Sequence, residues 1–286
     1  MEKDAEITIE CNPDDVTDEF TKGLTTLPVN RVSMGIQTFS DERLRFLNRR
    51  HTAAQTVEAV ARLRKVGLRN ISIDLMYGFP SETLNDWQRD IEAAIALNVE
   101  HLSAYCLMIE EGTPLHRMQT EPINEELERQ MYYMLIDRLE AAGYEHYEIS
   151  NFARHGFRSR HNSSYWKGIP YIGLGAAAHS YDIKTRSWNV SNIHQYIEGI
   201  DNGQPCYEQE QIDDDTRYND IITTALRTQE GLNLNMLSDK QRYYCLHEAR
   251  KYIDGGQLQL SPDHHLCLTR EGLFVSDMVM SELIMI

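Results

Sequence analysis

The chain has 286 residues, of which 41% are hydrophobic, and a formal net charge of -16 at pH 7, so it can form one large or two ordinary domains with a real core. Its mean hydropathy of -0.50 argues against a membrane protein, and its pI near 5.1 argues against general nucleic-acid binding, which needs a dominant basic face. The acidic first residues are unlike a signal peptide, so we expect a cytoplasmic protein.

The five cysteines are widely spaced along the chain. An odd number at such spacing fits neither a disulfide framework nor a C-x-x-C metal site. We therefore expect reduced thiols at Cys11, Cys106, Cys206, Cys245 and Cys267.

The first half of the sequence alternates predicted strands with predicted helices. Helix starts are indicated by Asn12, Ser40, the capping boxes Thr52-x-x-Gln55 and Thr83-x-x-Asp86, and Asn124, since these side chains accept hydrogen bonds from the first turn. Gly67 and Gly143 are placed to end two of the helices. The strands are predicted at Glu6 to Glu10, Arg31 to Gln37, Asn70 to Met76, His101 to Leu107 and Tyr144 to Ile149.

This rhythm predicts an α/β fold in which parallel strands are covered by helices, either a doubly wound sheet or part of a barrel. In such folds, ligands bind at the carboxyl ends of the strands. Polar residues stand near four successive strand ends, at Glu10, Gln37, Asp74 and Tyr105. Together they predict a lined pocket.

The stretch from Ile149 to Tyr181 contains no Asp or Glu, although the chain is acidic. It carries basic side chains, three histidines and six aromatic residues, a composition that suggests an anionic, flat or extended ligand. The alternative is a long surface connection whose aromatic side chains merely pack. Because it follows the fifth predicted strand, we expect it to close the pocket. Arg154, Arg158 and Arg160 are candidates for carboxylate contacts.

The second half begins with a predicted strand at Ser187 to Val190 and a helix at Asn192 to Ile200. A linker at Gly203-Gln204-Pro205 divides the chain into a domain of residues 1–202 and a domain of residues 203–286. The latter shows helix, hairpin and helix, like a winged helix. Its acidic residues outnumber its basic ones, so docking of a partner is favoured over DNA binding. The predicted elements are Asp213 to Arg227, Asp239 to Ile253, Gln257 to Leu260, His264 to Leu268 and a helix after Thr269.

Among the motifs, no Ser-His-Asp signature is legible. Gly173-Leu174-Gly175 favours close backbone packing over a dinucleotide site, because no helix is predicted after it. The element HNxxYW, with His161, Asn162, Tyr165 and Trp166, carries an imidazole that can ligate iron and rings that can stack on a flat ligand. By composition alone, a hydrogen-bonded histidine is the commoner role.

Several motifs in order resemble the oxygen-independent coproporphyrinogen III oxidase family of radical S-adenosylmethionine (SAM) proteins. HNxxYW, PYIGLG (Pro170 to Gly175) and Ala178-His179-Ser180 resemble the HemW branch of haem chaperones, and the last residues resemble the family's C-terminal helical domain. The resemblance implies a partial (β/α) barrel plus a small helical domain. It rests on IECNPDD (Ile9 to Asp15), NRVSMGIQTFSDERLRFLNRRH (Asn30 to His51), IDLMYGFPSET (Ile73 to Thr83) and YEISNFARHGFRSRHNSSYW (Tyr147 to Trp166).

By this resemblance, SAM is implied at Glu10, Gln37, Arg49 and Asp74, and haem at His161, Asn162, Tyr165 and Trp166. His161 is a candidate iron ligand, in competition with His155 and His179. Haem and a haem-acceptor protein are the implied partners. The alternative is an oxidase that decarboxylates coproporphyrinogen. An unrelated hydrolase or isomerase would need a catalytic constellation that the sequence does not show.

The family's C-x-x-x-C-x-x-C loop, which holds a 4Fe-4S cluster, does not occur in the sequence. The first strand matches the family's third, so we expect a truncated radical SAM barrel. Whether such a chain is an enzyme is left open by the sequence, because reductive cleavage of SAM needs the cluster. We expect this chain to be inactive alone as a radical enzyme, and an open sheet edge to favour self-association.

Overall fold

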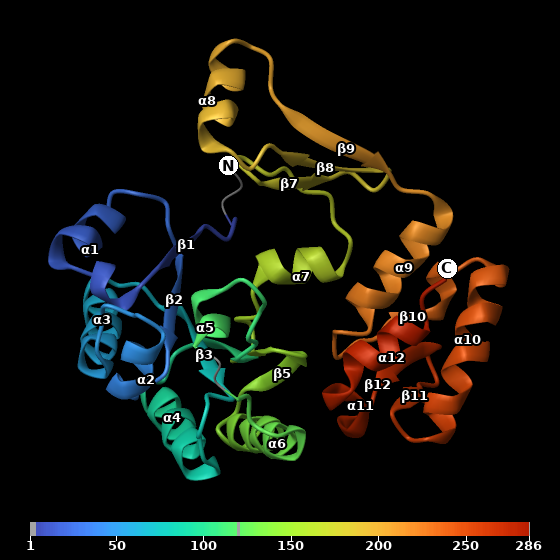
Figure 1. The fold of residues 1–286 in the computed structure, drawn as a ribbon, viewed down its shortest axis with the longest axis horizontal. Helices are drawn as coiled ribbons and strands as arrows, with labels where there is room; N and C mark the ends of the chain where they lie inside the picture. Colours follow the sequence, from blue (N-terminus) through green and yellow to red (C-terminus); the bar gives the residue numbers. More distant parts are fainter. Residues whose placement is uncertain (1–3, 119–120, 286) are drawn as a thin grey trace. The chain divides into compact units, whose positions relative to one another are not determined.

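The computed structural model describes residues 4–118 and 121–285, which form two compact units that divide between Ser159 and Arg160 (Figure 1). The predicted boundary between residues 202 and 203 stays a prediction. Within the second unit, strands on either side of that position pair with each other, as described below. In the described part of the chain, no helix has the length and apolar character needed to cross a bilayer.

The first unit contains a six-stranded sheet in the order β1-β2-β3-β4-β6-β5, and its first four strands are parallel. Its strands are β1 (Thr8–Cys11), β2 (Arg31–Gln37), β3 (Asn70–Tyr77), β4 (His101–Cys106), β5 (Glu145–Glu148) and β6 (Asn151–Ala153). Its helices are the short η1 (Pro13–Asp15), α1 (Asp18–Leu24), α2 (Asp41–Phe46), α3 (Ala53–Lys65), α4 (Leu84–Ala96), α5 (Pro114–Arg117) and α6 (Glu125–Ala141). The α/β prediction is confirmed.

The predicted helix starts are also confirmed. Thr52 with Gln55 and Thr83 with Asp86 both form complete capping boxes at α3 and α4. Such reciprocal bonds satisfy backbone amides that would otherwise have no partner in the first turn. Gly67 follows the end of α3 with φ of 88°, a left-handed conformation that glycine adopts without strain.

The fifth predicted strand exists as β5, but the prediction that it continues the parallel series beside β4 is wrong. A strand that the sequence did not reveal, β6, lies between β4 and β5 and is antiparallel to both. Only Ile149 and Ser150 separate β5 from β6. A connection this short forms a hairpin, whereas a parallel pair needs a long crossover.

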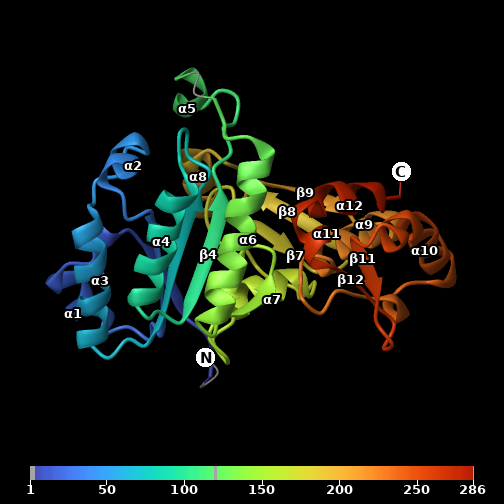
Figure 2. The ribbon, with the colours of Figure 1, turned by 90° about the horizontal axis from the view of Figure 1, so that it is seen from below.

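The two faces of the sheet differ in chemistry. The face covered by α3, α4 and α6 (Figure 2) is apolar, with Val32, Ile36, Ile71, Ile73 and Leu102 fully buried. The side chains on the opposite face of β2, β3 and β4 are polar: Arg31, Ser33, Ser72, Asp74, His101 and Ser103. Burial of the apolar face stabilises the unit, whereas the opposite face carries the polar groups of the sheet.

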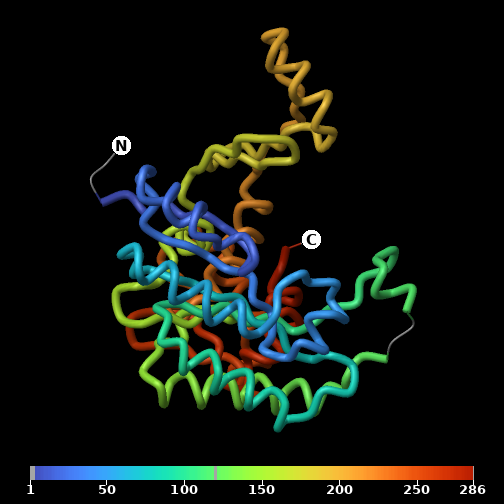
Figure 3. The backbone as a smooth tube through the Cα atoms, turned by 90° about the vertical axis from the view of Figure 1, so that its left-hand side faces the viewer, coloured from blue at the N-terminus to red at the C-terminus, as the bar shows by residue number. Residues whose placement is uncertain are grey.

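The second unit begins with α7 (Arg160–Trp166) and contains two three-stranded sheets. The first sheet is antiparallel and α8 stands out from it (Figure 3). The predicted hairpin of β11 and β12 is confirmed, whereas the two-residue strand β10 was missed and the last predicted helix is split in two. The elements are β7 (His179–Tyr181), β8 (Thr185–Asn189), α8 (Ile193–Asp201), β9 (Tyr207–Gln211), α9 (Asp214–Ala225), β10 (Leu232–Asn233), η2 (Leu234–Met236), α10 (Asp239–Asp254), β11 (Leu258–Leu260), β12 (His265–Leu268), α11 (Arg270–Phe274) and α12 (Ser276–Glu282).

Candidate functional site

Three of the four residues implied in SAM binding interact electrostatically in the first unit. The carboxyl group of Asp74 on β3 is influenced by the charges of Glu10 on β1 and Arg49 after α2. Arg49 is oriented by Asn12, whose Oδ1 accepts a hydrogen bond of 2.8 Å from its Nη1. The structure therefore brings a guanidinium and two carboxylates to the carboxyl-end side of neighbouring parallel strands.

Gln37, the fourth of these residues, is placed by an irregular end of β2. The register with β3 shifts between Met34 and Gln37, and Gln37 takes a left-handed φ of 66°. A Cβ atom at Gly35 would lie 2.8 Å from Nε2 of Gln37, so Gly35 leaves room for this amide. A bulge with backbone strain at a strand end is typical of a re-aimed functional side chain.

Asp74 has an altered acidity. Burial raises its pKa to about 6, and the carboxylate of Glu10 acts in the same direction. A hydrogen bond with Ser103 and the charges of Arg31 and Arg49 oppose the rise. A carboxyl group with such a pKa in the company of a cation is typical of ligand sites. Tyr105, the last predicted strand-end residue, is exposed at the end of β4 and pairs with Met76 across the strands.

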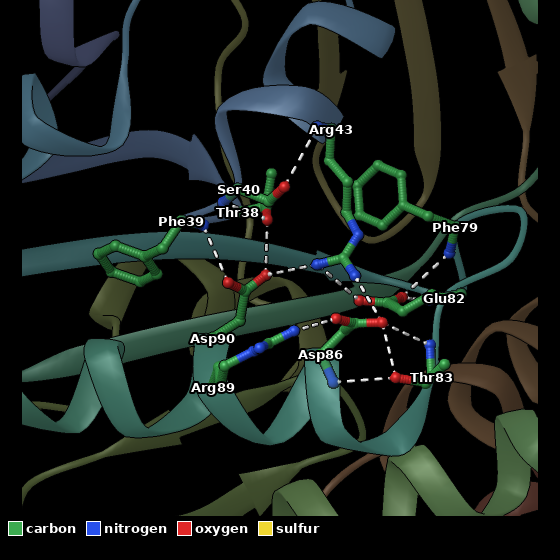
Figure 4. Close-up of polar contacts among 11 residues, drawn as sticks. Thr38, Phe39, Ser40, Arg43, Phe79, Glu82, Thr83, Asp86, Arg89 and Asp90 are labelled. Carbon is green, nitrogen blue, oxygen red and sulfur yellow. Dashed lines mark hydrogen bonds and ion pairs between the residues drawn. The ribbon is translucent and has the colours of Figure 1, made fainter.

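The sequence did not reveal a second polar cluster, which lies between α2 and α4 (Figure 4). Arg43 forms ion pairs with Glu82 at 3.4 Å, Asp86 at 3.3 Å and Asp90 at 3.6 Å. Asp90 also accepts a hydrogen bond of 3.1 Å from the backbone amide of Phe39 and a bond of 2.5 Å from the Thr38 hydroxyl. The cluster borders a pocket of about 640 Å³ and joins segments that follow β2 and β3.

Glu82 gives this cluster a pH dependence. Its side chain is fully buried, and burial raises its pKa from 4.5 to about 7. Between these two pKa values the folded state keeps a proton on Glu82 that the unfolded chain has lost. The stability that protonation of Glu82 contributes is therefore complete below pH 4.5 and is lost as the pH rises through 7. We expect Glu82→Gln to flatten the dependence of Tm on pH across this interval.

Thermal unfolding monitored by circular dichroism between pH 4.5 and 7.5 measures this effect. Glu140→Gln is the control, because Glu140 is exposed on α6. Its pH profile should match that of the unmodified chain. Equal slopes for Glu82→Gln and the unmodified chain would contradict the assignment.

The HNxxYW residues lie on α7 of the second unit. Helical spacing places His161 beside Tyr165 and Asn162 beside Trp166. The His161 and Tyr165 rings meet edge to face with centroids 4.8 Å apart. Trp166 is covered by the guanidinium of Arg227 at 5.0 Å, and its buried Nε1 has no hydrogen-bond partner among the described residues.

The aromatic contacts continue from α7 to β7. Tyr165 meets Tyr171 at 4.7 Å between centroids, and Tyr171 stacks on Tyr181 at 6.0 Å. Tyr171 and Tyr181 also line a groove of about 580 Å³ together with Pro170 and Ile172. This volume lies in the usual range for organic ligands, and aromatic walls suit a flat one.

The other candidates from the basic stretch have different surroundings. Arg154 packs over the ring of Tyr144 at 4.1 Å, and Arg158 forms an ion pair of 3.0 Å with Glu145. His179 is exposed and stacks on Trp188 at 5.9 Å. His155 is exposed and lies 3.2 Å from Glu145.

The cysteines do not fit an iron–sulfur cluster. Over residues 4–118 and 121–285, no three His, Cys, Asp or Glu side chains are grouped so that they could hold a metal. Cys11 and Cys106 are partly buried, and burial raises the pKa of the Cys11 thiol to about 12. An iron–sulfur cluster is held by several cysteine thiolates that lie close together, and the described residues contain no such group.

Comparisons with known proteins relate this chain to radical SAM proteins. Residues 1–94 match the model of the Radical SAM superfamily. Heme chaperone HemW of Bacillus subtilis is 35% identical over 243 residues, which cover 82% of this chain and 64% of that protein. Heme chaperone HemW of Mycobacterium tuberculosis H37Rv is 32% identical over 286 residues, which cover 98% of this chain and 72% of that protein.

The fold is also found in a solved structure. Coproporphyrinogen III oxidase (HemN) from Escherichia coli, a radical SAM enzyme, superposes with a TM-score of 0.81 over 98% of this chain and 70% of that chain, at 18% identity. The chain thus spans about two thirds of the length of the relatives it matches. The sequence relationship over nearly the whole chain, together with this fold, shows that the chain belongs to the HemW family of radical SAM proteins.

Proposed function

We propose that this chain binds haem at α7 and SAM at the carboxyl ends of β1 to β3. The aromatic series His161, Tyr165, Tyr171 and Tyr181 carries the haem proposal, because it joins a possible iron ligand to a groove with aromatic walls. Matched relatives bear the name heme chaperone. A flat iron-containing tetrapyrrole combines the two features that this series can recognise.

In the haem site, His161 is the proposed iron ligand, with His155 and His179 as the competing candidates. Tyr165 and Trp166 would stack on the macrocycle, and Asn162 would contribute a hydrogen bond. The exposed position of His161 suits a chaperone, since a carrier must release its haem to an acceptor protein.

In the SAM site, the four residues supply complementary chemistry. The Arg49 guanidinium would pair with the amino-acid carboxylate of SAM by charged hydrogen bonds. Glu10 and Asp74 would accept hydrogen bonds from the amino group and the ribose hydroxyls, and the Gln37 amide would complete the set. Gly35 supports this fit, because a Cβ atom there would lie 2.8 Å from Nε2 of Gln37 and would displace this amide.

Radical SAM proteins use a 4Fe-4S cluster to cleave SAM reductively. The cysteines of this chain do not fit such a cluster, so no catalytic step is assigned to its residues. Radical SAM oxidoreductase activity is proposed only for a chain that carries the cluster cysteines.

The partners proposed are a tetrapyrrole and a haem-acceptor protein, in the cytoplasm and without nucleic acid. Self-association through β1 is part of the proposal, because β1 is the terminal strand of the six-stranded sheet and pairs with β2. An edge strand offers backbone groups to a second chain.

A haem titration followed by absorbance tests the function. We expect a shifted Soret band that saturates near one haem per chain. Coproporphyrinogen turnover by a cluster-containing protein of full length would favour the alternative, an oxidase in porphyrin biosynthesis. A haem spectrum identical with that of haem in buffer would contradict the chaperone proposal.

A further inference from the structure

His51 lies in the connection between α2 and α3, two residues after Arg49, and its side chain is fully buried. Nε2 of its ring lies 3.1 Å from the backbone carbonyl oxygen of Ile36, near the end of β2. A carbonyl oxygen can only accept a hydrogen bond, so Nε2 carries the proton and donates. Nδ1 has no hydrogen-bond partner among the described residues and lies 4.0 Å from Oδ1 of Asp14, whose other oxygen pairs with Arg50.

The same carbonyl oxygen closes a tight turn around Gln37. The backbone amide of Thr38 donates to the Ile36 oxygen at 2.8 Å, and Gln37 between them has a φ of 66°. A bond from residue i+2 back to residue i around a positive φ is the pattern of the classic γ-turn, which is rare and strained. Such a conformation persists only where its surroundings hold it in place. His51 supplies this support, because it donates a second bond to the oxygen on which the turn closes.

The turn determines where the Gln37 amide lies. The position of a Cβ atom on Gly35 is 2.8 Å from Nε2 of Gln37 and 3.8 Å from Oδ1 of Asn12, so both groups lie beside the same point. Oδ1 of Asn12 also accepts the hydrogen bond from Arg49. The Gln37 amide is therefore close to the residue that orients the Arg49 guanidinium, and a change of φ at Gln37 would move it away.

We propose that His51 is a positioning residue, which holds the strained turn at Gln37 and thereby keeps the Gln37 amide at the ligand site. Burial lowers the pKa of His51, which favours the neutral ring with its one proton on Nε2. The inference rests on the proposed SAM site for its ligand, whereas the effect of His51 on the turn needs no ligand.

Two variants separate the hydrogen bond from the presence of a polar side chain. His51→Gln places its amide nitrogen near the position of Nε2, whereas His51→Asn places it near Nδ1 and leaves the Ile36 oxygen without its second donor. Without ligand, hydrogen exchange of the Thr38 amide should be about tenfold faster in His51→Asn than in the unmodified chain, the effect of one lost hydrogen bond. His51→Gln should stay within about twofold of the unmodified chain.

Isothermal titration with SAM tests the action through Gln37. His51→Asn should bind SAM about tenfold more weakly than the unmodified chain, and His51→Gln should keep most of the affinity. Combining His51→Asn with Gln37→Ala should weaken binding no further than Gln37→Ala alone, because one residue acts through the other.

Tyr144→Phe is the control. It removes another buried bond from a side chain to a backbone oxygen, the bond of 2.6 Å from the Tyr144 hydroxyl to Val99, and should change neither the exchange of Thr38 nor the affinity. Equal Thr38 exchange in His51→Asn and the unmodified chain, or additive losses of affinity in the double variant, would overturn the proposal. Faster exchange in His51→Asn, without SAM binding by the unmodified chain, would support the role of His51 at the turn and contradict the proposed SAM site alone.

Discussion

His161→Ala is expected to weaken haem binding more than about tenfold and to remove the shifted Soret band, because loss of an iron ligand costs at least as much as loss of its supporting contacts. Absorbance titration of the variant with haem measures both effects. Tyr165→Phe should bind nearly as well as the unmodified chain, since it keeps the ring that meets His161 at 4.8 Å.

Three further histidine variants serve as comparisons. His194→Ala is the control for surface histidines, because His194 is exposed on α8, and it should bind haem normally. His155→Ala and His179→Ala should also retain the Soret shift. Loss of the shift in either of these two, with an unchanged spectrum for His161→Ala, would contradict the assignment of the iron ligand.

Arg43→Met is expected to lower the free energy of unfolding by about 3–5 kcal/mol, the usual cost of leaving buried charges without their partner. Glu82 is fully buried and the Asp90 side chain is 5% exposed, so both would lose their counterion in a dry environment. The loss should be larger at pH 8 than at pH 5, because Glu82, with a pKa of about 7, is protonated at the lower pH.

Urea unfolding of Arg43→Met at the two pH values measures this loss. Arg45→Met is a matched control, since Arg45 lies on the same helix and is exposed. Its free energy of unfolding should change by less than about 0.5 kcal/mol. Equal midpoints for the two variants would show that the cluster does not stabilise the fold.

The predicted helix starts proved reliable because their causes are local. The side chain of Thr52 bonds to an amide three residues away, and so does that of Thr83. The pairing of the fifth strand failed because pairing is not local: β6 occupies the position beside β4, and its three residues have no alternation long enough to reveal a strand.

In the candidate site too, local features could be predicted from the sequence and contacts between distant segments could not. Glu10, Gln37 and Asp74 could be predicted from their positions near the ends of apolar strands, and the resemblance added Arg49. The orienting bond from Asn12 to Arg49 spans 37 residues and left no sequence signal. The interaction of Thr38 with Asp90 spans 52 residues and was missed for the same reason.

By itself, the sequence determined the α/β class, the succession of capped helices and strands, the strand-end residues and the HNxxYW element, because short-range hydrogen bonds and apolar periodicity are written into neighbouring residues. Only the tertiary structure decided which charges are paired. Burial and the distance between segments far apart in the chain determine whether a buried polar group finds a partner, as the Arg43 guanidinium does, or has none among the described residues, as Nε of Arg31 does.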